Sequence, residues 1–278
     1  MLTVSPRRRF LKLASAVFPI SMFGFPSRTL GLALPENGAP SADIPVAEQF
    51  PMHPPELVRE VVIVSHFDLN RVKELVEARP SLARAAWDWG FGDWEDALGA
   101  ASHTGNRAIA EYLISKGARP SLFSSTMLGH FDIVKAFLAA HPGVERTRGP
   151  HSITLLAHAQ AGGEAARPVF EYLQTLGDAG KDPVIPLSDS DANAIKGTYV
   201  FGASVSEQVD VTVERGMVLW TRKGKVGRPL THLGSRVFYP AGAAAVRIHF
   251  VEEGAAMLMT VEDPNVVLTA RRKAGAPS

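Results

Sequence analysis

The middle of the chain repeats one helical pattern. Four segments place apolar residues at positions i, i+3 and i+4, the spacing of one face of an α-helix, and most of them end at a turn-forming Gly or Pro. A shorter helix rich in small residues precedes each of the later segments. One helix pair cannot bury its apolar face alone, so we expect stacked pairs with a continuous core. The four segments lie at 67–80, 105–118, 129–142 and 169–177.

From Ile195 onward the pattern changes to alternating apolar and polar residues, as in strands with one buried face. Val209, Val211 and Val213 show the alternation, and turns such as Arg215-Gly216 separate the segments. Six or seven short strands at roughly ten-residue spacing predict an antiparallel meander that curls into a small barrel or sandwich. The predicted fold class is therefore α+β, with a helical solenoid followed by a small antiparallel β-barrel or sandwich.

The helical segments resemble ankyrin repeats. Gly129–Lys135 (GHFDIVK) follows the family's G-H-x-E-I-V pattern, and Gly117-Ala118 keeps the Gly-Ala at the end of a repeat. Asp96–Gly99 replaces the family's T-P-L-H, and the interval from Gly117 to His141 is shorter than a family repeat, as if that copy had lost its hairpin finger. The resemblance implies a short ankyrin-like solenoid that binds a protein partner.

The C-terminal stretch resembles the lipocalin-like domain that is appended to some bacterial serine hydrolases, from Gly197–Tyr199 near its start to Ala270–Arg272 at its end. This leaves open an alternative function as a small-ligand carrier or an enzyme that acts through the β-domain, with the repeats as a docking platform. Four aromatic residues are candidates for lining a cavity, although we favour a packed core for them: Trp220, Phe238, Tyr239 and Phe250.

The first residues resemble a twin-arginine export signal, whose pathway carries folded proteins across a membrane. Small residues at Gly31 and Ala33 suit cleavage near Ala33. An uncleaved anchor is the alternative, but Pro19 and Pro26 break an apolar stretch that is short for a spanning helix. We therefore expect a periplasmic or secreted protein that contacts the membrane only transiently, through its signal peptide. The residues that match the signal are Arg7, Arg8, Phe10, Leu11 and Lys12.

Composition divides the chain further and excludes some functions. Residues 1–33 form the predicted signal peptide and carry five basic and no acidic side chains, so the net charge of the remainder is +1 − 5 = −4. A mildly acidic body does not suit nucleic-acid binding, so we expect no nucleic-acid partner. The absence of Cys excludes disulfides and Cys-ligated metals.

The predicted parts after the signal are a Pro-rich linker at 34–55, repeats at 56–177, a linker at 178–194 and a β-domain at 195–273.

Residues 86–96 are the most unusual segment, since they hold three of the four Trp residues and four acidic residues. The resemblance to ankyrin repeats implies that a hairpin finger projects at this point, and exposed Trp residues often dominate binding. We consider two alternatives: the rings and acids grip a sugar or a cationic ligand, or the rings fold back onto the next repeat while Asp93 or Asp96 caps a helix. The predicted partner-binding residues are Trp87, Asp88, Trp89, Phe91, Asp93 and Trp94.

Other chemistry has less support in the sequence. His103, His130, His151 and His158 lie in or beside the repeats, but no pair has the i, i+4 spacing of a helical metal site, so we expect no metal and no cofactor. Paired carboxylates are available at 88–96, where we expect a solvated surface. No Ser lies in a G-x-S-x-G frame. The leading hypothesis is an exported, non-enzymatic binding or scaffold protein whose protein partner is unidentified.

Overall fold

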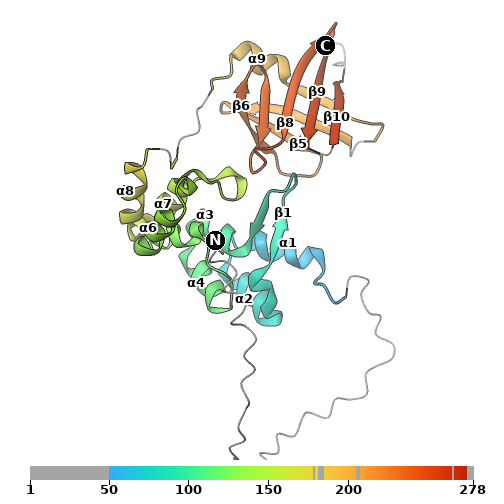
Figure 1. Cartoon of the computed structure of the whole chain (residues 1–278). Coiled ribbons are helices and arrows are strands. Elements are labelled where there is room, and N and C mark those ends of the chain that lie inside the picture. Colours follow the sequence, from blue (N-terminus) through green and yellow to red (C-terminus); the bar gives the residue numbers. More distant parts are fainter. Residues whose placement is uncertain (1–49, 178, 181–184, 205–206, 265, 274–278) are drawn as a thin grey trace, which may run out of the picture. The chain divides into compact units, whose positions relative to one another are not determined.

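The computed structural model describes residues 50–177, 179–180, 185–204, 207–264 and 266–273. The predicted export signal and most of the predicted Pro-rich linker lie outside these residues. All described elements belong to one compact unit of the chain. This unit begins with helices and ends with strands, which confirms the α+β fold class (Figure 1).

The helical part begins with α1 (Pro55–Val64) and α2 (Leu69–Ala78) and continues as short and longer helices in alternation. Side-chain caps fix several starts: Asp68 accepts a hydrogen bond from the backbone N–H of Arg71 at 3.0 Å, and Thr154 accepts one from that of Ala157 at 3.0 Å. The later helices are α3 (Ala97–His103), α4 (Arg107–Ser115), α5 (Leu122–Met127), α6 (Phe131–Ala140), α7 (Leu155–Ala161) and α8 (Arg167–Thr175).

Glycines make the tight turns inside these helix pairs. Gly105 lies between α3 and α4 with a φ of +73°, and a Cβ there would lie 2.2 Å from the carbonyl oxygen of Ala161. Gly129 lies between α5 and α6 with a φ of +74°, and its Cβ would lie 2.1 Å from the carbonyl oxygen of Ala165. Both positions therefore need glycine for two reasons, the left-handed backbone and the close approach of another segment.

Two apolar clusters form the helical core. One contains the buried side chains of α1 to α4, such as Val61, Leu98 and Leu113, and the other contains those of α6 to α8, such as Val134 and Leu173. No described helix has the length and apolar character needed to cross a membrane. Short 3-10 helices connect the longer elements at Pro80–Arg84, Val144–Arg146, Pro150–Ser152 and Gly163–Ala166.

A two-stranded antiparallel hairpin, β1 (Ala86–Asp88) and β2 (Trp94–Asp96), precedes α3. Trp87 lies opposite Glu95 in its register. The hairpin occupies the Trp-rich segment singled out by the sequence. Asp96 ends β2 and caps α3, because its carboxylate accepts a hydrogen bond from the backbone N–H of Gly99 at 2.5 Å.

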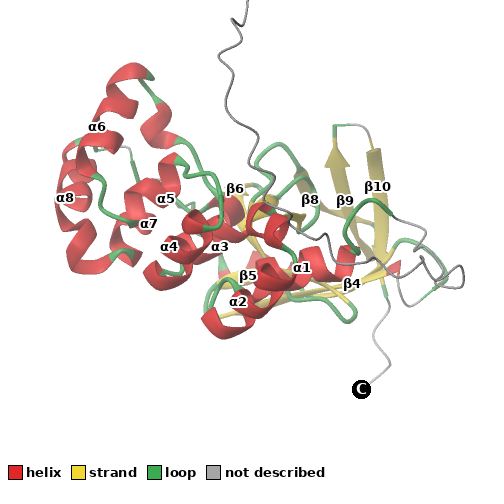
Figure 2. Ribbon diagram, turned by 90° about the horizontal axis from the view of Figure 1, so that it is seen from below, coloured by secondary structure: helices red, strands yellow, loops and turns green. Residues whose placement is uncertain are grey.

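After α9 (Asp189–Ile195), eight antiparallel strands close a barrel in the order β10-β3-β4-β5-β6-β7-β8-β9 (Figure 2). The barrel branch of the barrel-or-sandwich prediction is confirmed, and the strands are more numerous than predicted. The strands are β3 (Gly197–Val200), β4 (Gln208–Glu214), β5 (Met217–Arg222), β6 (Arg228–Gly234), β7 (Val237–Pro240), β8 (Arg247–Glu253), β9 (Ala256–Asp263) and β10 (Val266–Arg272).

Alternate residues of the strands fill the barrel interior. In the register of β8 and β9, Ile248 faces Val261 and Phe250 faces Met259, and all four side chains are buried. Phe238, one of the four aromatic residues proposed for a cavity, is fully buried among them; Phe250 is a second, and Trp220 packs against the same cluster. These three side chains contribute to the packed core, as we favoured, while Phe238 also borders a pocket beside Leu230 and His232, and Tyr239 is half-buried outside this cluster.

Candidate metal centre

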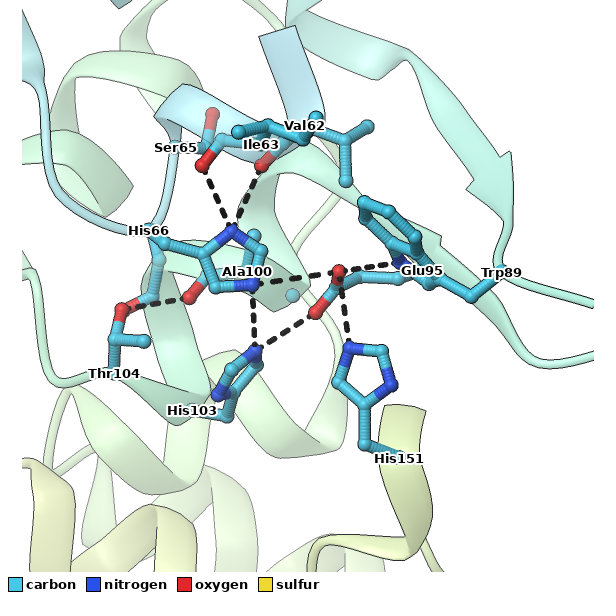
Figure 3. A network of polar contacts seen from close by, with 12 residues as sticks. Val62, Ile63, Ser65, His66, Trp89, Glu95, Ala100, His103, Thr104 and His151 are labelled. Atoms are coloured by element: carbon cyan, nitrogen blue, oxygen red, sulfur yellow. Dashed lines mark hydrogen bonds and ion pairs between the residues drawn. The ribbon is translucent and has the colours of Figure 1, made fainter. Parts of the chain in front are cut away.

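Four side chains from four separate elements converge on one point. His66 follows the end of α1, Glu95 lies on β2, His103 ends α3, and His151 lies in the 3-10 turn Pro150–Ser152. Each offers one nitrogen or oxygen atom, and these atoms all lie within 4.8 Å of one another. Figure 3 shows the three imidazole rings arranged around the Glu95 carboxylate.

The separations between these atoms suit a single bound ion. His103 Nε2 lies 3.1 Å from His66 Nε2 and 2.8 Å from Glu95 Oε1. Glu95 Oε2 lies 3.6 Å from His66 Nε2 and 3.4 Å from His151 Nε2. Two ligands bound to Zn²⁺ at 2.0–2.1 Å and at the tetrahedral angle lie about 3.3 Å apart. These four separations, from 2.8 to 3.6 Å, bracket that value, so small side-chain adjustments would complete a tetrahedral site.

Backbone carbonyls orient the ring of His66. Its Nδ1 lies 2.9 Å from the carbonyl oxygen of Ile63 and 3.1 Å from that of Val62 (Figure 3). Because carbonyl oxygens only accept hydrogen bonds, Nδ1 carries the ring hydrogen and is the hydrogen-bond donor. Asn106 donates a hydrogen bond from its side-chain amide to the carbonyl oxygen of His66. The lone pair of the ring is therefore on Nε2, the atom that faces the cluster, as in most metal-bound histidines.

A buried carboxylate orients the ring of His151 in the same way. Asp93 Oδ2 lies 2.8 Å from His151 Nδ1, and Asp93 Oδ1 accepts a hydrogen bond from the His151 backbone N–H at 2.9 Å. The Asp93 side chain is only 2% exposed. Carboxylate–histidine pairs of this kind fix the tautomer of a metal ligand and raise its basicity.

The Glu95 carboxylate has one satisfied and one unsatisfied oxygen. Its side chain is fully buried, and Oε2 accepts a hydrogen bond from the indole N–H of Trp89 at 2.8 Å. Oε1 accepts no hydrogen bond of ordinary geometry, although His103 Nε2 lies nearby. Oε1 faces His103 Nε2 at 2.8 Å, and an ion placed between these two atoms would satisfy both of them.

Electrostatics hold a proton in the cluster when no ion is bound. Burial raises the pKa of Glu95, but His103, His151 and His66 outweigh burial and lower that pKa to about 2. Burial lowers the pKa of His151, but Asp93 and Glu95 outweigh it and raise that pKa to about 9. At neutral pH the anionic Glu95 thus lies beside a protonated His151, which must lose its proton before it can bind a metal.

Access to the cluster is from one side. Glu95 and His103 lie deep, with side chains 0% and 11% exposed, whereas His66 and His151 are 22% and 31% exposed. An ion would therefore enter past His66 and His151 and reach the carboxylate last.

The predicted partner-binding residues divide into groups that the sequence did not separate. Trp89 and Asp93 hydrogen-bond to members of the cluster. Trp87 packs on the helical core, and the Phe91 ring lies 5.7 Å from the ring of Trp220 on the barrel. Trp94 is 63% exposed.

The carboxylates of this segment are not the solvated surface that we expected. Asp93 and Glu95 are buried, and each is hydrogen-bonded to another side chain, Asp93 to His151 and Glu95 to Trp89. Asp96 is half-buried as the cap of α3, as one alternative proposed. Only Asp88 of the four lies at the surface, where it accepts a hydrogen bond from the backbone N–H of Gly90 at 2.8 Å.

Sequence reasoning named two members of the cluster, His103 and His151, and missed His66 and Glu95. The i, i+4 spacing rule found nothing because each ligand comes from a different element. His130 is exposed at the start of α6, and His158 is buried outside the cluster with its Nε2 unpartnered.

The chain matches no protein-family model and no curated protein sequence. The site's own geometry therefore supplies the evidence for function.

Proposed function

We propose that this protein binds one divalent transition-metal ion, with Zn²⁺ as the reference ion, through His66, Glu95, His103 and His151. The observation that supports it is the convergence of three imidazole nitrogens on one buried carboxylate, with the four ligand atoms within 4.8 Å of one another. The proposal replaces the sequence-based expectation that the chain has no metal site.

The donor set favours one class of ion. Three imidazole nitrogens and one carboxylate suit Zn²⁺, Cu²⁺, Ni²⁺ and Co²⁺, whereas Mg²⁺ and Ca²⁺ prefer oxygen ligands. Four protein ligands complete a tetrahedral shell, and catalytic zinc sites keep one position open for water. The arrangement therefore supports a metal-binding or metal-stabilised protein.

Competition with a chromophoric chelator tests the proposal. The chelated protein without its leader should take up one equivalent of Zn²⁺, and Co²⁺ should give the visible absorption of a tetrahedral nitrogen–oxygen site. His103→Ala removes a deep ligand and should weaken binding by more than about 100-fold, because even outer residues of metal sites contribute 10- to 100-fold.

His130→Ala is the matched control, since His130 is exposed, makes no capping hydrogen bond and lies outside the cluster. Equal zinc affinity in the wild type, His103→Ala and His130→Ala would refute the site. Binding of Mg²⁺ in preference to Zn²⁺ would refute the class of ion.

A second candidate function is protein binding by ankyrin-like repeats, as the sequence resemblance implies. The alternation of short and longer helices and the hairpin before α3 support it, and the 63% exposed Trp94 offers a contact residue. Trp94→Ala should reduce capture of a partner from periplasmic extract while the helical circular dichroism stays unchanged. Capture that is unaffected by this change would exclude Trp94 as the contact.

We also propose export by the twin-arginine pathway, from residues 1–33, which lie outside the described structure. Replacing Arg7 and Arg8 with Lys should keep the protein in the cytoplasm, since that pathway reads the arginine pair. Cell fractionation measures the outcome. A Lys-Lys variant that still reaches the periplasm would contradict the proposal.

A further inference from the structure

Arg228 of the barrel binds the tip of the hairpin that supplies Glu95, and we call this set of contacts the grip of the barrel on the hairpin. The guanidinium of Arg228 on β6 donates hydrogen bonds to the carbonyl oxygen of Gly90 at 2.9 Å and to that of Trp89 at 2.6 Å. The same guanidinium lies 5.8 Å from the centre of the Phe91 ring, and its side chain is 13% exposed. Trp89 in turn donates to Glu95, so this grip fixes the backbone of a residue that orients a ligand.

Asp93 joins the barrel to a second ligand. Its carboxylate holds His151 at both the ring and the backbone, and Oδ2 lies 3.7 Å from Nη2 of Arg228. Gly242 of the turn after β7 presses on the same carboxylate, because a Cβ at Gly242 would lie 2.1 Å from Asp93 Cγ. No larger residue fits there without displacing Asp93.

The same turn also holds the backbone beside His151. The backbone N–H of Gly242 donates a hydrogen bond to Ser152 Oγ at 2.7 Å. His151 and Ser152 have φ values of +58° and +61°, a conformation that non-glycine residues rarely adopt and that needs support from neighbours. Asp93 supports His151, and Gly242 supports Ser152.

We propose that Arg228 and Gly242 of the barrel are positioning residues of the metal centre, and that metal binding and the grip of the barrel on the hairpin stabilise each other. The barrel then serves as the outer support of the site. Coupling between two equilibria is reciprocal, so whatever loosens the grip weakens metal binding by the same factor that metal binding tightens the grip. This inference depends on the proposed metal binding.

Arg228→Lys tests it with little change in charge. Lys keeps the positive charge but has no planar fork to reach two carbonyl oxygens at once. Zinc affinity should fall about tenfold, the lower range for outer residues of a metal site. Gly242→Ala should weaken binding at least as much, since its methyl group displaces Asp93. Arg215→Lys, at an exposed arginine of the barrel, is the matched control and should leave the affinity unchanged.

Hydrogen exchange of the wild type gives a readout that needs no variant. Zn²⁺ should slow exchange of the amides of the hairpin tip and of Gly242, which lie outside the ligand shell, and Arg228→Lys should reduce that protection. If the wild type binds no Zn²⁺, the proposed function fails. If the wild type binds Zn²⁺ but Arg228→Lys binds equally well, or Gly242 gains no protection, only the coupling is refuted.

Discussion

Thermal unfolding of the wild type and of Glu95→Gln, with and without Zn²⁺, is the most direct test of the site. A ligand at 100 times its Kd stabilises the folded state by about 2.7 kcal/mol. For a folded unit of this size, 1 kcal/mol shifts the Tm by about 2–4 °C. We therefore expect Zn²⁺ at that excess to raise the Tm of the wild type by about 5–10 °C.

Glu95→Gln should change both the metal-free and the zinc-bound melts. Gln resembles the protonated form of Glu95, and the pKa of Glu95 is lowered from its ordinary value of 4.5 to about 2. Since one pKa unit corresponds to 1.36 kcal/mol, the free energy of unfolding of the metal-free variant should be lower than that of the wild type by on the order of 3 kcal/mol. With affinity reduced more than about 100-fold, the same Zn²⁺ concentration adds at most about 0.4 kcal/mol, a shift below about 2 °C.

Differential scanning calorimetry of chelated protein measures these shifts, with His130→Ala and Mg²⁺ as controls for the residue and the ion. His130→Ala should keep the full zinc shift of the wild type, and Mg²⁺ should leave the Tm of the wild type where it is without metal. A Glu95→Gln variant that keeps the zinc shift would show that the carboxylate is not a ligand.

Two further predictions concern stability. The folded-state pKa of His151 is raised to about 9, so the stability that its protonated ring contributes is complete below pH 6.5 and is lost as pH rises through 9. The folded-state pKa of His158 is lowered to about 4, chiefly by burial, so the folded protein loses stability as pH falls from 6.5 through 4. The metal-free protein should thus be most stable near pH 6.5 in urea titrations, and a maximum displaced beyond pH 9 or below pH 4 would contradict these shifts. Gly105→Ala should cost at least about 2 kcal/mol, because its methyl group meets a backbone oxygen, while Gly117→Ala, with a φ of +93° and open space, should cost about 1 kcal/mol. Equal losses in urea unfolding would contradict the packing argument.

The order of elements was predictable because it depends on local spacing. Apolar residues at i, i+3 and i+4 predicted helices at 105–118 and 129–142, and the structure has α4 and α6 within them. Alternation at Val209 and Val211 predicted a strand whose two valines are buried, as they are in β4. The number of strands was underestimated because β3 has only four residues and β6 (RPLTHLG) contains Pro229 and ends at Gly234, so neither shows a clear alternation.

The site was not predictable by the same route. His66 and His103 are 37 positions apart and come within 3.1 Å only because α1 and α3 pack together. Glu95 looked like one of several surface acids, and only its burial on β2 distinguishes it from Asp88. Spacing rules detect ligands on one element, and this cluster draws on four.

The sequence by itself determined the helix-then-strand order, the glycine turns and the packed aromatic core of the β-domain, since each of these follows from residues near one another in the chain. Tertiary structure alone decided which acids are buried, which histidines meet, and that Arg228 reaches a hairpin more than a hundred residues away, at Gly90. The physical reason is that a side chain's charge, tautomer and partners depend on the groups that surround it in the folded state, and those groups come from distant segments.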